Sequence, residues 1–267
     1  MTPVVGPSSG PAQALVLSYH AVSATWPSHL AVRPDRLEAQ LQRLRSRGYR
    51  PATVHHAVHD PPAARTVAIT FDDGYRSVLQ VAFPILERLG FVGTVFVPTD
   101  FPEAGRPMAW PGIDQWLGTQ HEQELCPLSW NQIRQLVQSG WEIGSHGCSH
   151  PDLPELSDGE LERELRLSRQ RLEDELEQPC RSLAYPFGTY DERVMRAARM
   201  AGYSTACAVP AGRAAADPLA FPRIGIYRPD GMAAFRLKVS PRLRRARYGP
   251  AADVLLPVAR LRTALRR

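Results

Sequence analysis

Residues 66–74 read Thr-Val-Ala-Ile-Thr-Phe-Asp-Asp-Gly, an apolar run that ends in two adjacent carboxylates and a glycine. The run predicts a β-strand over 66–71, and Asp72-Asp73-Gly74 is predicted to open a helix directly after it. Two neighbouring carboxylates at such a junction are difficult to solvate together, so one is expected to bind a cation while the other acts as a base. The structural alternative is a helix N-cap, because Asp is common there.

Outward from this strand, one local pattern recurs four times: an amphipathic helix, then a glycine and an aromatic residue, then a β-prone run. The glycine suits the left-handed position that ends a helix. The junctions are Gly48-Tyr49, Gly90-Phe91, Gly140-Trp141 and Gly202-Tyr203, and further strands are expected at 14–19, 92–97, 141–145, 182–185 and 203–209. Alternating strands and helices predict a mostly parallel α/β sheet, either doubly wound or closed into a barrel.

Polar or turn residues follow four of the expected strands. In α/β folds of this kind, functional groups collect at the carboxyl ends of parallel strands. The residues at these ends are His20, Asp72-Asp73, His146 and Pro186–Gly188. The longest helix is predicted to start with a capping box formed by Ser157 and Glu160.

Residues 145–150 read Ser-His-Gly-Cys-Ser-His and carry two histidines four positions apart. Two imidazoles at this spacing can reach one metal ion if the segment is helical or tightly turned. Neutral imidazoles with one carboxylate make a typical open zinc site that leaves a position for water. Cys148 between them could be a soft ligand, but His146, His150 and Asp73 already complete the set, which favours a packing role for the thiol.

Residues 184–190 read Ala-Tyr-Pro-Phe-Gly-Thr-Tyr. The structural interpretation is a strand that ends in a Pro-Gly turn. The functional interpretation is a rigid wall formed by Tyr185, Pro186 and Phe187, whose backbone N–H groups could stabilise an oxyanion.

These segments together resemble the polysaccharide deacetylases with a NodB-homology domain, which form carbohydrate esterase family 4. Residues 70–74 match the first motif of that family, and His146 to His150 match its His-[Ser/Thr]-x-x-His motif except at Gly147. The resemblance covers roughly residues 14–240. It implies a single-domain, distorted (β/α) barrel that usually holds zinc and removes acetyl groups from N-acetylated sugars or sometimes from O-acetylated glycans.

The resemblance also implies roles for individual residues. Asp72 would be the general base, while Asp73, His146 and His150 would bind a divalent metal, with Zn²⁺ expected. Such a metal polarises the amide carbonyl and lowers the pKa of its bound water. The oxyanion would be stabilised by the metal and by a backbone N–H that the family match places at Phe187.

The sequence departs from the family pattern at two points. The third family motif, Arg-x-Pro-Tyr, is replaced by residues 184–187, so the arginine that tethers the base is missing. The late Leu-x-His motif that supplies the acid is also missing, since no histidine follows His150. Residues 17–20 (Leu-Ser-Tyr-His) resemble the Leu-x-Tyr-His segment of the poly-N-acetylglucosamine deacetylases, a branch with permuted motif order. His20 is therefore expected to be the acid, and Arg223 the replacement tether.

Substrate contacts are expected from the Pro/Gly-broken stretch 101–127, which contains Trp110 and Trp116. Aromatic faces stack on sugar rings, and loops of this kind often carry binding residues. Anchoring of the loop is an equal alternative for both tryptophans.

The 267 residues, 43% of them apolar, are enough for one large domain at 14–240 between a flexible N-terminus at 1–13 and a basic tail at 241–267. Residues 236–267 contain ten Arg or Lys and one acid, a charge of +9, so the other 22 basic and 26 acidic residues give −4. Residues 250–267 are predicted to form a basic amphipathic helix, which favours a membrane surface or docking on the barrel. Nucleic acid is not expected, because no recognition motif accompanies the charge.

Neither a secretory signal nor a Cys-x-x-Cys pair is evident, and the four cysteines are widely spaced. These features predict free thiols and a cytoplasmic location, with peripheral contact at the inner membrane face. A leader already cleaved from this chain would reverse that expectation.

The favoured function is a metal-dependent carbohydrate deacetylase acting on an acetylated sugar. One alternative is an amidase for a small non-carbohydrate amide or a cyclic ureide. Another is a non-catalytic carbohydrate-binding relative, suggested by the missing arginine and late histidine. The presence of Asp72 beside a complete set of metal ligands disfavours it, since binding alone would need no free base there.

Overall fold

The computed structural model describes residues 14–61, 63, 65–209 and 217–248. Nine strands form one parallel sheet in the order β10-β9-β8-β7-β6-β5-β1-β11, with β4 paired to β5. The strands are β1 (Leu15–Tyr19), β4 (Arg50–Pro51), β5 (Thr66–Phe71), β6 (Gly93–Val97), β7 (Glu142–Ser145), β8 (Ser182–Ala184), β9 (Thr205–Ala208), β10 (Phe221–Pro222) and β11 (Ile224–Gly225). A separate pair joins β2 (Ala21–Val22) to β3 (Ala31–Val32).

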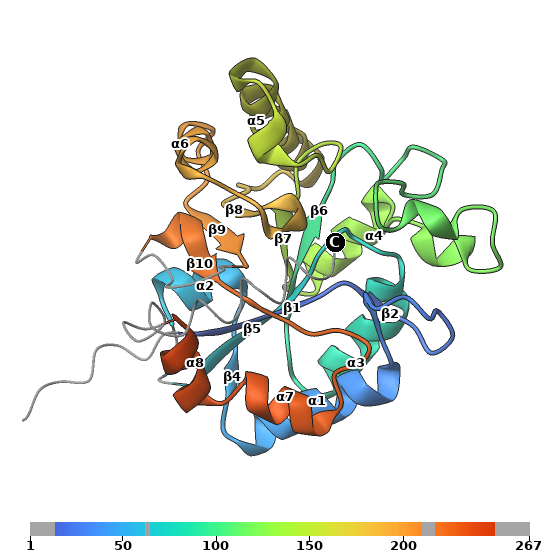
Figure 1. The fold of residues 1–267 in the computed structure, drawn as a ribbon, viewed down its shortest axis with the longest axis vertical. Coiled ribbons are helices and arrows are strands. Elements are labelled where there is room, and N and C mark those ends of the chain that lie inside the picture. Colours follow the sequence, from blue (N-terminus) through green and yellow to red (C-terminus); the bar gives the residue numbers. More distant parts are fainter. Residues whose placement is uncertain (1–13, 62, 64, 210–216, 249–267) are drawn as a thin grey trace, which may run out of the picture.

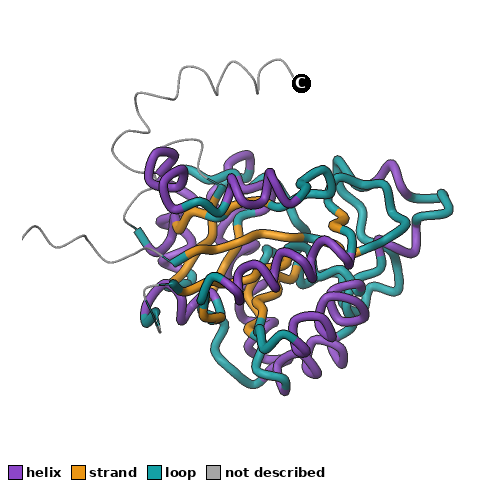
Figure 2. Tube along the Cα trace, turned by 90° about the horizontal axis from the view of Figure 1, so that it is seen from below, coloured by secondary structure: helices purple, strands orange, loops and turns teal. Residues whose placement is uncertain are grey.

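The two edges of the sheet meet at a single residue. β10 pairs with β9 and β11 pairs with β1, and only Arg223 lies between β10 and β11. The sheet is therefore nearly closed into a barrel, and Figure 2 shows the strands enclosed by helices. The predicted single-domain (β/α) barrel is confirmed, and the doubly wound alternative is wrong.

Helices surround the barrel (Figure 1), and four of them end two residues before the glycines predicted to terminate them: Gly48, Gly90, Gly140 and Gly202. The predicted capping box of Ser157 and Glu160 starts the long helix, and Ser129 with Gln132 caps another in the same way. The helices are α1 (Pro34–Ser46), α2 (Val54–His59), α3 (Phe83–Arg88), α4 (Trp130–Gln138), α5 (Asp158–Leu176), α6 (Glu192–Met200), α7 (Met232–Lys238) and α8 (Pro241–Tyr248).

Strand register explains why the chemical groups meet. Tyr19 on β1 is level with Phe71 on β5, so His20 and Asp72 follow at the same edge of the sheet. Ser145 on β7 pairs with Val97 on β6, and therefore His146 leaves the sheet at that edge too. Because all of these strands are parallel, their carboxyl ends form one mouth of the barrel.

Side chains inside the barrel form a core separate from the one between sheet and helices. Small or apolar side chains fill this interior: Val16, Ala68, Phe96, Ala184 and Cys207. The helix α2 covers the opposite mouth, where Val54 N–H donates to Thr94 Oγ1. The mouth at the amino ends of the strands is thus covered by α2. The mouth at the carboxyl ends is open, and the polar residues that follow the strands lie there.

One local prediction is wrong. Asp72 and Asp73 do not open a helix, because a turn and a bridge between Tyr75 and Pro127 follow them, and a π-helix over Val78–Ala82 begins only later. Asp73 itself has a left-handed backbone, with φ of 69°. The helix N-cap alternative is therefore excluded, and the left-handed turn aims the Asp73 carboxylate away from its neighbour.

The predicted flexible N-terminus at 1–13 and the amphipathic helix at 250–267 lie outside the described residues, so both stay predictions. At the start of the predicted tail, α8 contacts the barrel through Arg244, whose Nη2 donates to the carbonyl of Ala14. Within the described part of the chain, no helix is long and apolar enough to cross a bilayer.

Candidate active site

The open mouth of the barrel holds a cavity of about 280 Å³. Residues from the ends of β1, β5, β7 and β8 line it, together with the loop that carries Trp110 and the segment after β11. Two site residues expected from the sequence do not border this cavity: Trp116, and Pro186, which lies buried between two residues that do. The others all line it: His20, Asp72, Asp73, Trp110, His146, His150, Tyr185, Phe187 and Arg223.

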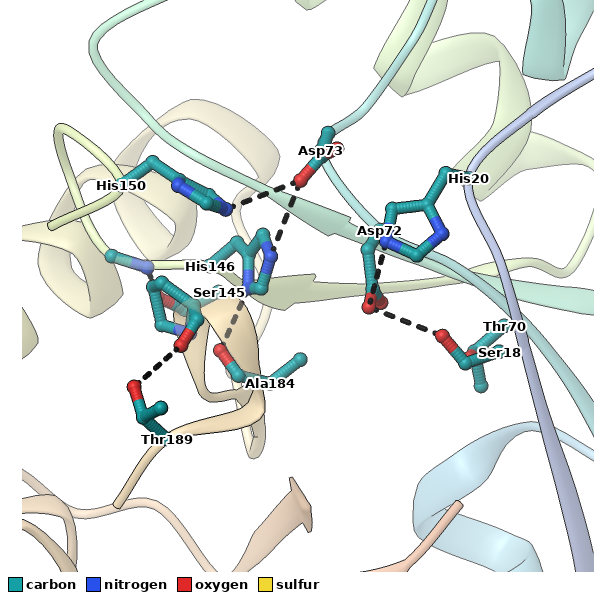
Figure 3. A network of polar contacts seen from close by, with 12 residues as sticks. Ser18, His20, Thr70, Asp72, Asp73, Ser145, His146, His150, Ala184 and Thr189 are labelled. Atoms are coloured by element: carbon teal, nitrogen blue, oxygen red, sulfur yellow. Dashed lines mark hydrogen bonds and ion pairs between the residues drawn. The ribbon is translucent and has the colours of Figure 1, made fainter. Parts of the chain in front are cut away.

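Asp73, His146 and His150 converge at the base of the cavity (Figure 3). The Nε2 atoms of both histidines lie 3.3 Å from Asp73 Oδ1, and one potential ligand atom from each residue falls within 4.8 Å of the others. All three side chains are buried. Asp73 Oδ1 is buried and accepts no regular hydrogen bond from the described residues, so the two imidazole nitrogens are the polar groups that face it.

The donor set fits a divalent cation. One carboxylate and two imidazoles are the ligands typical of catalytic zinc sites. His146 Nδ1 lies 2.7 Å from the carbonyl oxygen of Ala184, and a proton donated there leaves Nε2 free to bind a metal. Burial alone would raise the pKa of Asp73, but the two imidazoles beside it hold that pKa well below its ordinary value. The carboxylate is therefore ionised and available as a ligand.

His150 is fixed by aromatic packing. The ring of Trp110 stacks on it with centroids 4.1 Å apart, and the ring of Phe187 meets it edge-on at 4.6 Å. Trp110 is only 8% exposed, which favours the anchoring alternative over sugar stacking. Trp116 packs against Trp26 and has the same kind of role.

Asp72 is held from inside the barrel by Arg223. The guanidinium donates from Nη1 to Oδ1 at 2.6 Å and from Nη2 to Oδ2 at 2.9 Å, a bidentate pair in which Arg223 is 1% exposed. Ser18 Oγ also donates to Oδ2, at 3.2 Å. Burial alone would raise the pKa of Asp72, but the charge of Arg223 holds it below its ordinary value. The structure thus brings the predicted tether and base together.

His20 lies on the other side of Asp72 from the metal ligands (Figure 3). Its Nε2 is 3.9 Å from Asp72 Oδ2, and its ring stacks against Tyr227 with centroids 6.2 Å apart. Nothing in the described part of the chain bonds to His20 Nδ1. Because His20 and Asp72 both line the cavity, the His20 imidazole can contact a ligand that binds next to Asp72.

The predicted wall after β8 is a 3₁₀ turn over Pro186–Gly188. Phe187 has φ of 57° and exposes 49% of its surface at the cavity, while Pro186 is buried. Tyr185 is also buried, and its hydroxyl donates to the carbonyl of Leu219 at 2.8 Å, so that hydroxyl has a structural role. The exposed aromatic surface of the cleft is the ring of Phe187.

Three residues of the site were missed by the sequence analysis. Ser18 could have been found, because residues two apart on a strand share a face and His20 was already expected inside. His29 and Tyr227 line the cavity from irregular segments, for which no periodic pattern exists. Burial, followed by the charge of His20, lowers the pKa of His29 below its ordinary value.

Comparison with known proteins places this geometry in a family. A family model described as polysaccharide deacetylase matches residues 59–206. The Bacillus subtilis (strain 168) protein YxkH, which carries a provisional polysaccharide deacetylase name, is 28% identical over 244 residues, or 90% of this chain and 76% of that protein. The poly-beta-1,6-N-acetyl-D-glucosamine N-deacetylase of Escherichia coli (strain K12) is 25% identical over 150 residues, which cover 49% of this chain and 20% of that enzyme.

A solved structure extends the likeness beyond the matched segment. The deacetylase PplD of Streptococcus pyogenes, in complex with acetate, superposes with a TM-score of 0.73 at 26% identity, covering 86% of this chain and 100% of its own. Asp72, Asp73, His146 and His150 lie within the family match, whereas His20 and Arg223 lie outside it. Because the model spans more than half of the sequence, the chain belongs to the polysaccharide deacetylase family.

Proposed function

We propose that this carbohydrate deacetylase hydrolyses the acetamide of an N-acetylated sugar, with Zn²⁺ at Asp73, His146 and His150. The observation that carries the proposal is the buried carboxylate pair, in which Asp72 is tied to Arg223 while Asp73 points at two imidazoles. The name of the E. coli relative, an N-deacetylase of an N-acetylglucosamine polymer, supports the choice of an N-acetyl group. A divalent cation in this site would polarise the acyl carbonyl and lower the pKa of a water molecule.

The chain's own residues supply the proton transfers. Asp72 accepts a proton from the water that attacks the acetyl carbon, and Arg223 keeps the carboxylate ionised and aimed at the cavity. The backbone N–H of Phe187 stabilises the oxyanion that forms. His20 then gives a proton to the nitrogen as the carbon–nitrogen bond breaks, so that acetate and a free amine leave.

Metal analysis followed by acetate release from N-acetylglucosamine oligomers tests this function. Purified protein should contain about one divalent ion per chain, lose activity on chelation and regain it with Zn²⁺. Release of acetate only from O-acetylated glycans would overturn the choice of an amide substrate. A protein that binds the oligomers without releasing acetate would overturn catalysis and favour the binding-module alternative.

Two further proposals concern the tail and the location of the protein. Peripheral membrane association through residues 250–267 rests on sequence pattern, and those residues lie beyond the part of the chain that the structure describes. A cytoplasmic location rests on the same kind of argument. Co-sedimentation of the full and the truncated chain with anionic liposomes tests the first proposal.

A further inference from the structure

The loop between the two metal-binding histidines is held by one carboxylate from helix α5. Glu164 Oε1 accepts hydrogen bonds from the backbone N–H of Cys148 at 2.7 Å, from the N–H of Ser149 at 2.7 Å, and from Ser149 Oγ at 3.3 Å. Three donors from two consecutive residues thus converge on a single oxygen atom. Three hydrogen bonds to one acceptor restrain the loop more than a single bond would.

The loop needs such a restraint because its backbone is left-handed at both ends. Gly147 has φ of +77°, and His150, a non-glycine residue, has φ of +64°. Glycine adopts this conformation freely, but for His150 it costs of order 1–3 kcal/mol and persists only where the surroundings enforce it. His150 therefore depends on outside contacts for its orientation, and Glu164 supplies them to the two residues before it.

Glu164 lies so close to Gly147 that the position has no room for a side chain. A Cβ atom at position 147 would lie 2.9 Å from Glu164 Oε1, and the left-handed φ there already disfavours any other residue. The lack of a side chain at position 147 therefore leaves room for the Glu164 carboxylate, which comes from helix α5. One turn further along the same helix, Ser168 bonds to Ser145 Oγ at 2.9 Å, on the other side of His146. The helix thus braces both sides of that ligand.

We propose that Glu164 is a positioning residue for the metal site, which holds the loop so that His146 and His150 present Nε2 to one ion. The proposal rests on the proposed function, since it assumes that these histidines bind a metal. Among the described residues Glu164 forms no ion pair, so its carboxylate is directed at this loop alone.

The test is the Zn²⁺ affinity of purified Glu164→Ala, measured by competition with a chromophoric chelator. Loss of an outer contact of a metal ligand typically costs about 10–100-fold in metal affinity, and we expect a loss in that range. Glu164→Gln keeps a carbonyl oxygen as acceptor and should lose less. A drop in kcat larger than any change in KM should accompany the loss.

Glu173→Ala is the matched control. Glu173 lies on the same helix and accepts a hydrogen bond from the backbone N–H of Cys180 at 3.0 Å, far from the histidines in sequence. It should leave Zn²⁺ affinity unchanged while losing a comparable backbone contact. Wild-type affinity in Glu164→Ala would overturn the positioning role, whereas a wild-type protein that binds no Zn²⁺ would overturn the proposed function itself.

A second, independent inference concerns a pocket on the side of the barrel away from the active site. Four arginines line this cavity of about 260 Å³, together with apolar side chains and Tyr49. Arg43 and Arg47 come from the end of α1, Arg65 precedes β5, and Arg236 belongs to α7. Partial burial, followed by the charges of Arg47 and Arg236, lowers the pKa of Arg43 below its ordinary value, which reflects how close the guanidinium groups are.

The positive charge exceeds what the local structure neutralises. The C-termini of α1 and α7 both face the pocket, and each contributes roughly −0.5 charge, about −1 in total, against four guanidinium groups. Among the described residues, none of the four arginines pairs with a carboxylate. Arg65 donates to the carbonyl of Arg47, which is neutral. A net charge near +3 therefore remains beside apolar walls formed by Leu44 and Val239.

We infer that this pocket binds the phosphate group of an organic phosphate, whose non-polar part meets the apolar wall. The probes are inorganic pyrophosphate in solution and vesicles that contain phosphatidic acid, compared with vesicles of phosphatidylcholine alone. Binding of pyrophosphate would indicate a soluble phosphate compound. Binding of acidic vesicles alone would indicate a lipid headgroup if it is weakened by substitution of the pocket arginines, since the basic tail would bind such vesicles without the pocket. Binding of neither would overturn the inference.

The variant Arg43→Ala with Arg236→Ala should weaken the observed binding at least about tenfold, because two strong phosphate contacts are lost. The matched control is Arg163→Ala with Arg166→Ala on α5, which removes the same charge from another surface. Pyrophosphate could also remove a metal ion from the active site. That effect would be the same in the pocket variant and in the control, so it cannot produce a difference in binding between them. Equal binding by the variant and the control would overturn the inference, and deacetylase activity should be unchanged in both.

Discussion

At the level of single residues, the two neighbouring carboxylates have opposite surroundings. Asp72 is bonded by the guanidinium of Arg223 and the hydroxyl of Ser18, whereas Asp73 Oδ1 faces two imidazole nitrogens at 3.3 Å. The left-handed φ of Asp73 makes this separation possible. A base and a metal ligand can therefore be adjacent in sequence without competing for the same partner.

The acid at His20 is the first residue-level prediction. His20→Ala should lower turnover by about 10²–10⁴-fold, the usual contribution of one acid or base, while metal content stays at the wild-type level. The proposed metal ligands are unchanged in this variant, because the contact of His20 is with Asp72. Turnover of N-acetylglucosamine oligomers and metal analysis of the same sample measure both. Unchanged turnover would assign the acid to another group.

The buried pair of Asp72 and Arg223 gives a prediction about stability. Arg223→Met leaves an uncompensated carboxylate inside the barrel and should lower the free energy of unfolding by about 3–5 kcal/mol. The double variant Asp72→Asn with Arg223→Met removes both charges and should recover part of that loss, on the order of 1 kcal/mol or more. Guanidinium denaturation of the two variants and the wild type measures this coupling. Independent, additive losses would contradict it.

At the level of elements, helix α2 covers the closed mouth of the barrel and carries a pair of histidines. His55 Nδ1 and His59 Nε2 both lie within 3.2 Å of Thr205 Oγ1, and their rings are 4.6 Å apart. The charged groups that face His55 are His59, Glu142, Arg181 and His56. Burial and then the neighbouring His59 lower the pKa of His55 below its ordinary value, although Glu142 opposes the shift.

The stability of α2 should therefore depend on pH. In the unfolded chain His55 has the ordinary histidine pKa of about 6.5. Just below that pH the unfolded chain binds a proton, while His55 in the folded protein stays neutral because its pKa is lower. This contribution to stability is complete above that pH and is lost as the pH falls below it. Urea denaturation at pH 7.5 and 5.5 should show a smaller loss for His55→Gln than for wild type. His121→Gln, in a distant loop, is the control, and an equal loss in all three proteins would contradict the prediction.

The elements also show how far the sequence could predict this molecule. The strands before His20, Asp72 and His146 were predictable, since apolar runs and helix-ending glycines mark them. Closure of the barrel at Arg223 was not, because β10 and β11 have two residues each and no period can be seen in so short a run. The helix expected after Asp73 failed for a related reason: a left-handed aspartate and the bridge of Tyr75 to Pro127 depend on tertiary contacts. The hydrogen bonds of Glu164 to the backbone of Cys148 and Ser149 could not be predicted either, since no local sequence pattern connects these two segments.

For the whole molecule, the uneven charge predicts a role for the C-terminal tail. Residues 236–267 carry ten basic residues and one acid. Truncation after Arg247 removes four of these basic residues (Arg260, Arg262, Arg266 and Arg267) and the single acid. Each basic residue near an anionic surface contributes about 1 kcal/mol, so the truncated chain should bind anionic liposomes less tightly than the full chain. Co-sedimentation with anionic and with neutral vesicles measures the difference. Equal sedimentation of the two proteins would contradict membrane binding by the tail and favour docking of the predicted amphipathic helix over 250–267 on the barrel.

Metal binding should be visible in the stability of the entire barrel, because its ligands come from two separate parts of the sheet. Asp73 follows β5 and His146 follows β7, so an ion between them joins strands that are separated by β6. Free Zn²⁺ at 100 times its dissociation constant stabilises a folded protein by about 2.7 kcal/mol if the unfolded chain does not bind it. For a chain of this size that corresponds to a rise in Tm of roughly 5–10 °C.

Differential scanning calorimetry of the metal-free protein with and without Zn²⁺ measures this rise. Asp73→Asn with His150→Gln is the matched control, because it keeps side-chain volume and removes two ligands, so its Tm should not respond to Zn²⁺. The Glu164→Ala protein should respond with a smaller rise than wild type at the same Zn²⁺ concentration, because weaker binding lowers the free energy gained by linkage. A full rise in the double ligand variant would show that Zn²⁺ binds elsewhere and would separate metal binding from this site.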